Sequence, residues 1–162
     1  MADKIQKITP FLWFNSQAED AANFYASIFK DSEIKKIINY GEAGPAPPGS
    51  VMTVSFEIEG QKFTALNGVQ DIEFNQAISF VVNCESQAEV DYYWEKLTDG
   101  GEEQVCGWLK DRFGVSWQVV PIIMIEMMDD PDPEKAKRVI EAMLKMVKID
   151  IETLKKAYNN EI

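Results

Sequence analysis

The hydrophobic and polar positions of the first 70 residues change period several times. Residues 5–14 form an apolar, β-prone run, and the cap-type residues Asn15 and Ser16 follow it. Apolar side chains then recur at helical spacing, and alternating segments return on both sides of a Gly/Pro-rich loop at 41–50. The pattern predicts a strand at 5–14, a helix at 17–29, a strand at 33–40 and a hairpin of strands 51–59 and 62–67.

The same order of elements restarts at Ala77. The pattern predicts a strand at 77–82, a helix at 87–97 ended by Gly100-Gly101, an extended segment at 102–110, a turn at 111–114 and a strand at 115–120. The chain therefore contains two β-α-β-β-β units in tandem, with little residue identity between them.

After Pro121 the character of the sequence changes. The acidic connector 129–133 precedes a helix opened by Glu134, and Asp150 caps a shorter one. Five of the seven methionines lie in this tail, which indicates a core or a subunit interface. We expect one domain over 1–125, with modules at about 5–67 and 76–120, and a C-terminal helical extension over 126–162.

The charge balance excludes several classes of partner. The net charge is −11, which disfavours nucleic acid and anionic membranes and favours a neutral or cationic ligand. The longest apolar run, 119–125, is too short to span a bilayer, which needs about 20 residues. Two lone thiols, Cys84 and Cys106, are typical of a reduced, cytoplasmic protein.

The absence of histidine removes the commonest general base and metal ligand. Cys106 has Lys110 and Arg112 nearby in sequence, but without a histidine base it is interpreted as a small buried side chain. Glu102 and Glu103 point to opposite faces of a strand and cannot share one site. Asp111 and Gly114 suit a turn.

Gln118 is the sharpest candidate for a binding residue. Strand alternation puts Ser116, Gln118 and Val120 on one face, where the Gln118 amide either binds a ligand or makes an internal hydrogen bond. By the same alternation we expect Leu12 and Phe14 to face a cavity while Phe11 and Trp13 pack on the helix. The expected ligand-binding set is Leu12, Phe14, Asn67, Phe80, Trp108 and Gln118.

Several motifs together resemble a known family. They are ITPFLWF at 8–14, AEDAANFY at 18–25, AISFVV at 77–82, WEKL at 94–97, Gly100-Gly101 and DRFGVSWQ at 111–118. The chain resembles PhnB-like (3-demethylubiquinone-9 3-methyltransferase-like) proteins of the glyoxalase/bleomycin-resistance/extradiol-dioxygenase, or vicinal oxygen chelate, superfamily. The resemblance implies an α+β fold in which two βαβββ modules form open barrels, usually supported by homodimerisation.

The resemblance also implies where a divalent metal would bind. The family's ligand places fall on Pro10, within 64–67, on or beside Ser79, and on Gln118. None of these positions offers the imidazole or carboxylate that divalent zinc, iron or manganese prefers, so we expect no metal and no cofactor. The methyltransferase activity in the family's name would need an S-adenosylmethionine site, which is usually a glycine-rich turn between a strand and a helix. In this chain Asn15-Ser16 joins the first strand to its helix without a glycine.

Three functions remain open from the sequence. The first is a metal-free homodimer that binds a small, partly apolar molecule, neutral or cationic. The alternative is a metal-dependent lyase, isomerase or dioxygenase-like enzyme with atypical ligands, which rests on fold analogy. The third is a structural or regulatory dimer whose cavities are filled by Leu12, Phe14 and Phe80.

Overall fold

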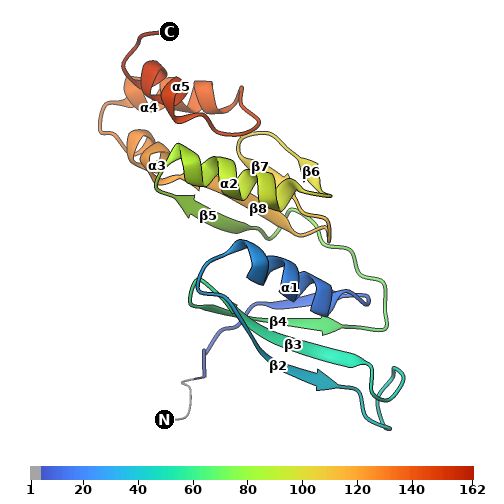
Figure 1. Cartoon of the computed structure of the whole chain (residues 1–162). Coiled ribbons are helices and arrows are strands. Elements are labelled where there is room, and N and C mark those ends of the chain that lie inside the picture. Colours follow the sequence, from blue (N-terminus) through green and yellow to red (C-terminus); the bar gives the residue numbers. More distant parts are fainter. Residues whose placement is uncertain (1–4) are drawn as a thin grey trace. The chain divides into compact units, whose positions relative to one another are not determined.

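A computed structural model describes residues 5–162 (Figure 1). The chain forms two compact units, residues 1–73 and 74–162. Each unit holds one four-stranded mixed sheet with a helix between its first and second strands, so the expected α+β fold of two βαβββ modules is confirmed.

The first unit follows the predicted order of elements. It contains β1 (Phe11–Phe14), α1 (Ala18–Ile28), β2 (Glu33–Asn39), β3 (Val51–Ile58) and β4 (Gln61–Asn67), and its sheet order is β1-β4-β3-β2. β1 is parallel to β4, while β4, β3 and β2 are antiparallel neighbours. The predicted hairpin turns at Glu59-Gly60, where both residues adopt positive φ.

The core of the first unit lies between α1 and one face of its sheet. Tyr25 of α1 stacks on Phe56, which stacks in turn on Phe63 with ring centroids 5.3 Å apart. Leu12 and Phe14 are 8% and 3% exposed, whereas Phe11 is 59% exposed. The helix therefore covers Leu12 and Phe14, and the sheet presents Phe11 on its other, open face.

The second unit repeats this arrangement and adds the tail. Its module contains β5 (Phe80–Cys84), α2 (Gln87–Thr98), β6 (Glu102–Glu103), β7 (Trp108–Lys110) and β8 (Ser116–Pro121), in the sheet order β5-β8-β7-β6. Leu109, Trp117 and Val119 are buried on the face that meets Val90, Trp94 and Leu97 of α2.

Three helices make up the tail: α3 (Ile122–Met128), α4 (Pro133–Met143) and α5 (Ile151–Tyr158). Asp132 and Asp150 accept hydrogen bonds from backbone N–H groups at the starts of α4 and α5, so the predicted cap at Asp150 is confirmed. The tail methionines pack largely into one apolar cluster with Val120, Val139, Ile149 and Leu154. The sequence did not predict α3, which occupies most of the apolar run 119–125.

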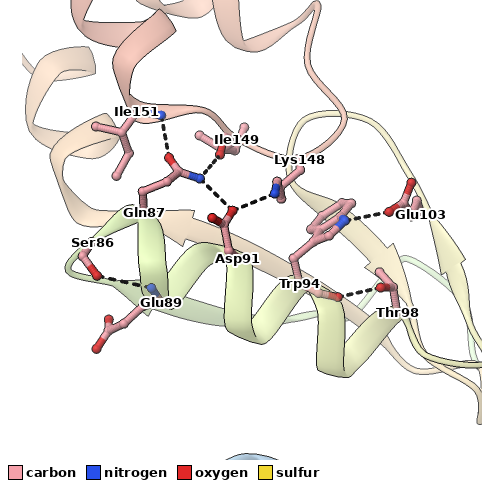
Figure 2. A network of polar contacts seen from close by, with 10 residues as sticks. All are labelled: Ser86, Gln87, Glu89, Asp91, Trp94, Thr98, Glu103, Lys148, Ile149 and Ile151. Atoms are coloured by element: carbon pink, nitrogen blue, oxygen red, sulfur yellow. Dashed lines mark hydrogen bonds and ion pairs between the residues drawn. The ribbon is translucent and has the colours of Figure 1, made fainter.

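A polar network ties the tail to α2 (Figure 2). The Gln87 side chain accepts a hydrogen bond from the Ile151 N–H at 2.8 Å and donates to the Ile149 carbonyl at 3.1 Å. Lys148 Nζ lies 2.6 Å from Asp91 Oδ1. Because Gln87 and Asp91 of α2 both contact the segment 148–151, they fix the position at which α5 begins.

Three predicted strands differ from the observed ones. β1 begins only at Phe11, since Pro10 has no N–H to donate to a ladder, and β5 begins at Phe80 rather than Ala77. The expected extended segment 102–110 divides into β6 and β7, because Cys106 and Gly107 adopt positive φ and donate to the Met146 and Val147 carbonyls. Within residues 5–162, no helix is long and apolar enough to cross a membrane.

Candidate functional site

The open face of the first sheet carries one row of side chains from four strands. Direct register pairs join Phe11 to Thr64, Thr64 to Ser55 and Ser55 to Lys36. Paired residues on adjacent strands point to the same face, and Phe56 marks the opposite, helix-covered face. The row therefore presents an aromatic ring, two hydroxyls and an ammonium group away from α1.

The open face of the second sheet carries the corresponding row. Val81 and Trp108 are the register partners of Gln118 on its two sides. Gln118 Nε2 donates a 2.9 Å hydrogen bond to the Ser79 hydroxyl, which lies just before β5. Gln118 and Trp108 are half-buried and Val81 is 48% exposed. The row itself is apolar apart from the Gln118 amide and the neighbouring Ser79 hydroxyl, which suits a small, partly apolar molecule.

The two rows are equivalent by topology. Thr64 of β4 pairs with Phe11 of β1 as Gln118 of β8 pairs with Val81 of β5. Of residues 64–67, Thr64 is therefore the one whose position in the first sheet is equivalent to that of Gln118 in the second. Pro10 makes its contact there through its backbone carbonyl, which accepts from the Thr64 N–H.

The residues at these places do not fit a divalent metal. Hydroxyls and an amide are weak ligands beside imidazole or carboxylate, and the Gln118 amide is already bonded to Ser79. Within residues 5–162, no three His, Cys, Asp or Glu side chains gather closely enough to hold a metal ion. We therefore derive no chemical step through a metal.

Three of the expected ligand-binding residues lie on the wrong face for that role. Leu12 and Phe14 are buried beneath α1. Phe80 packs on Trp117, its register partner, with ring centroids 5.3 Å apart. The expected orientation of β1 is therefore wrong, and Phe11 and Val81 occupy the open face instead.

Asn67 has a structural role. Its side-chain oxygen accepts from the Ala18 N–H at 2.8 Å, and its amide donates to the Val51 carbonyl at 3.1 Å. Asn67 thus satisfies an N–H at the start of α1, where Gln17 supplies no side-chain cap. It also lines a cavity of about 440 Å³ with Glu19, Asp20 and Tyr40.

Asp111 organises the turn before β8. It is 2% exposed, and its carboxylate accepts from the Phe113 and Val115 N–H groups and from the Trp117 indole. These three bonds satisfy a buried charge inside the DRFGVSWQ motif. The predicted turn is confirmed, and Asp111 shapes the strand that carries Gln118.

The two cysteines differ in environment. Burial, with a smaller contribution from the Glu89 carboxylate, raises the pKa of the Cys84 thiol to about 12. Such a thiol stays protonated at neutral pH and is no nucleophile. Cys106 is half-buried at the left-handed corner between β6 and β7.

The largest of the described cavities lies on the open face of the first sheet. Its volume is about 600 Å³, and Lys36, Ser55, Lys62 and Thr64 help to line it. Thr64 falls in the range 64–67 that the family resemblance implied, whereas the sequence did not indicate Lys36, Ser55 or Lys62. The position of the hairpin turn at 59–60 would have allowed the pairing of Ser55 with Thr64 to be predicted. The pairing of Lys36 with Ser55 depends on a β-bulge that no sequence pattern marks.

Sequence comparison identifies a family over most of the chain. The family described as 3-demethylubiquinone-9 3-methyltransferase matches residues 6–120. The match ends at β8, so α3, α4 and α5 lie outside it. No curated protein matches the chain.

Solved structures agree with that match. A PhnB protein from Bacillus cereus is 38% identical, with a TM-score of 0.66, and the match covers 72% of this chain and 99% of that one. The Pseudomonas aeruginosa protein PA1353 is 23% identical, with a TM-score of 0.61 and coverage of 72% and 98%. The fosfomycin resistance protein FosX from Mesorhizobium loti is 11% identical, with a TM-score of 0.53 and coverage of 74% and 92%. The last two show a shared glyoxalase/bleomycin-resistance-like fold.

Proposed function

Because the chain belongs to the PhnB-like 3-demethylubiquinone-9 3-methyltransferase family, we propose that it binds a small, partly apolar molecule on the open face of its second sheet, without a resident metal. The family's name does not fix the chemistry. The linker 15–17 between β1 and α1 has no glycine, and the start of α1 is occupied by Asn67, so nothing there favours an S-adenosylmethionine site.

The observation that carries the proposal is the row Val81, Gln118 and Trp108 with the bond from Gln118 to Ser79. Because its Nε2 atom donates to Ser79, Gln118 is oriented, and its carbonyl oxygen can accept a hydrogen bond from a ligand. The Trp108 indole ring supplies an apolar surface that also attracts cations. The second unit has 17 acidic and 10 basic side chains, so its field favours a neutral or cationic ligand.

We also propose that the protein acts as a homodimer in the cytoplasm. Phe11 and Val81 are large apolar side chains exposed on the open faces, and a second copy would cover them. The two free cysteines fit a reducing compartment. Light scattering on the full chain tests the dimer directly, and a monomer at micromolar concentration would contradict it.

Native mass spectrometry of the untagged protein, paired with elemental analysis, tests the binding function. We expect a small organic adduct and no stoichiometric transition metal. Gln118→Ala and Trp108→Ala should lose the adduct. Tyr92→Ala, which replaces an exposed residue of α2 in the same unit, should keep it.

Two results would overturn the proposal. Near-stoichiometric metal that is lost in Gln118→Ala would support a metal-dependent enzyme with atypical ligands. A bare protein that also fails to bind any compound in a thermal-shift screen would support a structural role for the fold.

A further inference from the structure

One cavity of the first unit is lined by positive charge, in contrast to the acidic chain as a whole. It is the cavity of about 600 Å³ on the open face of the first sheet. Three lysines line it, Lys35, Lys36 and Lys62, and they are half of the six basic side chains in residues 1–73. No carboxylate is among its described lining residues. In a chain with a net charge of −11, this is a local concentration of positive charge.

A β-bulge brings two of these lysines together. The register of β2 against β3 shifts between Ile34 and Lys36, so Lys35 is an extra residue in the ladder. In a regular strand, consecutive side chains point to opposite faces. The bulge relaxes this rule, and Lys35 and Lys36 both line the cavity.

The lysines differ in how far their charge is neutralised. Lys35 Nζ lies 2.6 Å from Glu33 Oε2 and 3.9 Å from Glu57 Oε2. Lys62 is the register partner of Glu57 across β3 and β4. Against these two carboxylates stand three ammonium groups, and Lys36 forms no ion pair within residues 5–162. The Lys36 ammonium, which pairs with no carboxylate of the described residues, lies in the row of Ser55 and Thr64.

That row has the donors that an anion needs. Lys36 is the register partner of Ser55, and Ser55 is the partner of Thr64, so one ammonium and two hydroxyls lie side by side. Ammonium and hydroxyl groups donate to carboxylate and phosphate oxygens. Ile5 lines the cavity and Phe11 lies in the same row as Thr64, and these apolar side chains favour an anionic group on an apolar body.

We propose that this cavity is a binding site for the anionic end of a small organic molecule, a carboxylate or a phosphate, held by Lys36, Ser55 and Thr64 with Lys62 beside them. The row around Gln118 belongs to the other unit, and the two proposals are tested with different variants. One site can therefore fail its test while the other stands.

The test is a titration of the full chain followed by amide NMR shifts, at constant ionic strength set with sodium chloride. The probes are benzoate, acetate, benzamide and inorganic phosphate. Benzoate should bind saturably, with shifts centred on Lys36, Ser55 and Thr64. Benzamide, which lacks the charge, and acetate, which lacks the apolar body, should bind more weakly. The stronger of benzoate and phosphate identifies the anionic group.

Variants that remove single charges distinguish a specific binding site from nonspecific attraction of anions to lysines. Lys36→Gln should weaken benzoate binding about tenfold, because one charge-assisted hydrogen bond is lost. Glu57→Gln should tighten it, because a carboxylate beside Lys35 is removed. Lys30→Gln, at an exposed lysine that does not line the cavity, should leave it unchanged.

Three results would overturn the proposal: no saturable shift with either anion, shifts scattered over lysines outside the cavity, or equal weakening by Lys30→Gln and Lys36→Gln. Far-UV circular dichroism should show native structure in each variant, since these side chains are exposed or half-buried.

Discussion

Gln118 Nε2 donates a 2.9 Å hydrogen bond to Ser79 Oγ, and this bond joins two of the places where the family resemblance puts metal ligands. Serine and glutamine satisfy each other there, so the pair needs no ion. Ser79→Ala should lower the unfolding free energy by about 1 kcal/mol or less, because the half-buried amide can turn to water. Urea unfolding measures this. A loss of several kcal/mol would show that the pair is a structural bond.

The orientation of β1 gives a matched pair of variants. Leu12→Ala should lower the unfolding free energy by about 2–4 kcal/mol, because it leaves a cavity beneath α1. Phe11→Ala, one residue away, should change it by less than about 1 kcal/mol, since the ring is 59% exposed. Urea unfolding of both variants is the measurement. Equal costs would contradict the assignment of faces, and a larger loss for Phe11→Ala in a dimer would locate the interface.

Asp111 should be among the most sensitive polar residues of the second unit. Asp111→Ala removes three hydrogen bonds and leaves the Val115 N–H and the Trp117 indole without their acceptor. We expect a loss of about 3 kcal/mol or more in unfolding free energy, measured by denaturant titration. Asp99→Ala is the control, because its ion pair with Arg112 is exposed and should contribute less than about 1 kcal/mol.

The polar network between α2 and the tail, which includes Gln87, Asp91 and Lys148, should weaken in acid. The hydrogen bond from Lys148, followed by that from Gln87, holds the pKa of Asp91 below its usual range. A carboxyl whose pKa is lowered by folding stabilises the fold above its unfolded pKa, and that stabilisation is lost as the pH falls through the folded value. Hydrogen exchange at the Ile151 amide should therefore speed up below about pH 4, beyond the intrinsic pH dependence.

Two variants check the origin of this effect. Lys148→Met should flatten the pH dependence, because it removes the group that lowers the pKa of Asp91. Lys137→Met, an exposed lysine on α4, should leave it intact. The same acid response in both variants would assign the effect to other carboxyls of the tail, such as Asp150, whose pKa is also lowered by hydrogen bonds at its cap.

Thiol labelling should distinguish the two cysteines. Cys84 is fully buried and its pKa is raised to about 12, so at pH 8 it should react with a thiol reagent only on unfolding. The native protein should therefore label at Cys106 alone, counted by mass spectrometry. Native Cys106→Ser should not label, and Cys84→Ser should label as the native protein does. Rapid labelling of Cys84 would show that β5 opens locally.

The sequence predicted most of the elements of the two modules but not the face of β1. Helices 17–29 and 87–97 and the hairpin were predicted closely, because apolar spacing and Gly60 mark them. The face of β1 was mispredicted because Phe11, Leu12, Trp13 and Phe14 are all apolar, so alternation carries no signal there. Gln118, in contrast, lies on the face opposite Trp117 as expected, because polar and apolar residues alternate at Ser116, Trp117 and Gln118.

The prediction of site residues from the sequence was limited in the same way. Gln118 was found from its own strand, whereas its partner Ser79 depends on the parallel pairing of β5 with β8. Lys35 and Lys36 were missed because a bulge sets their direction. Long-range register and local irregularity are set by tertiary packing, which a single sequence does not display.

The bulge at Lys35 also bears on how copies of this chain can meet. β2 is one of the two edge strands of its sheet, with one row of backbone groups open to pairing with another chain. A bulge beside two lysines breaks the regular spacing of those groups and sets charge against an approaching strand. Pairing with a strand of another chain is thereby discouraged at this edge, which limits uncontrolled growth of the sheet from one copy to the next.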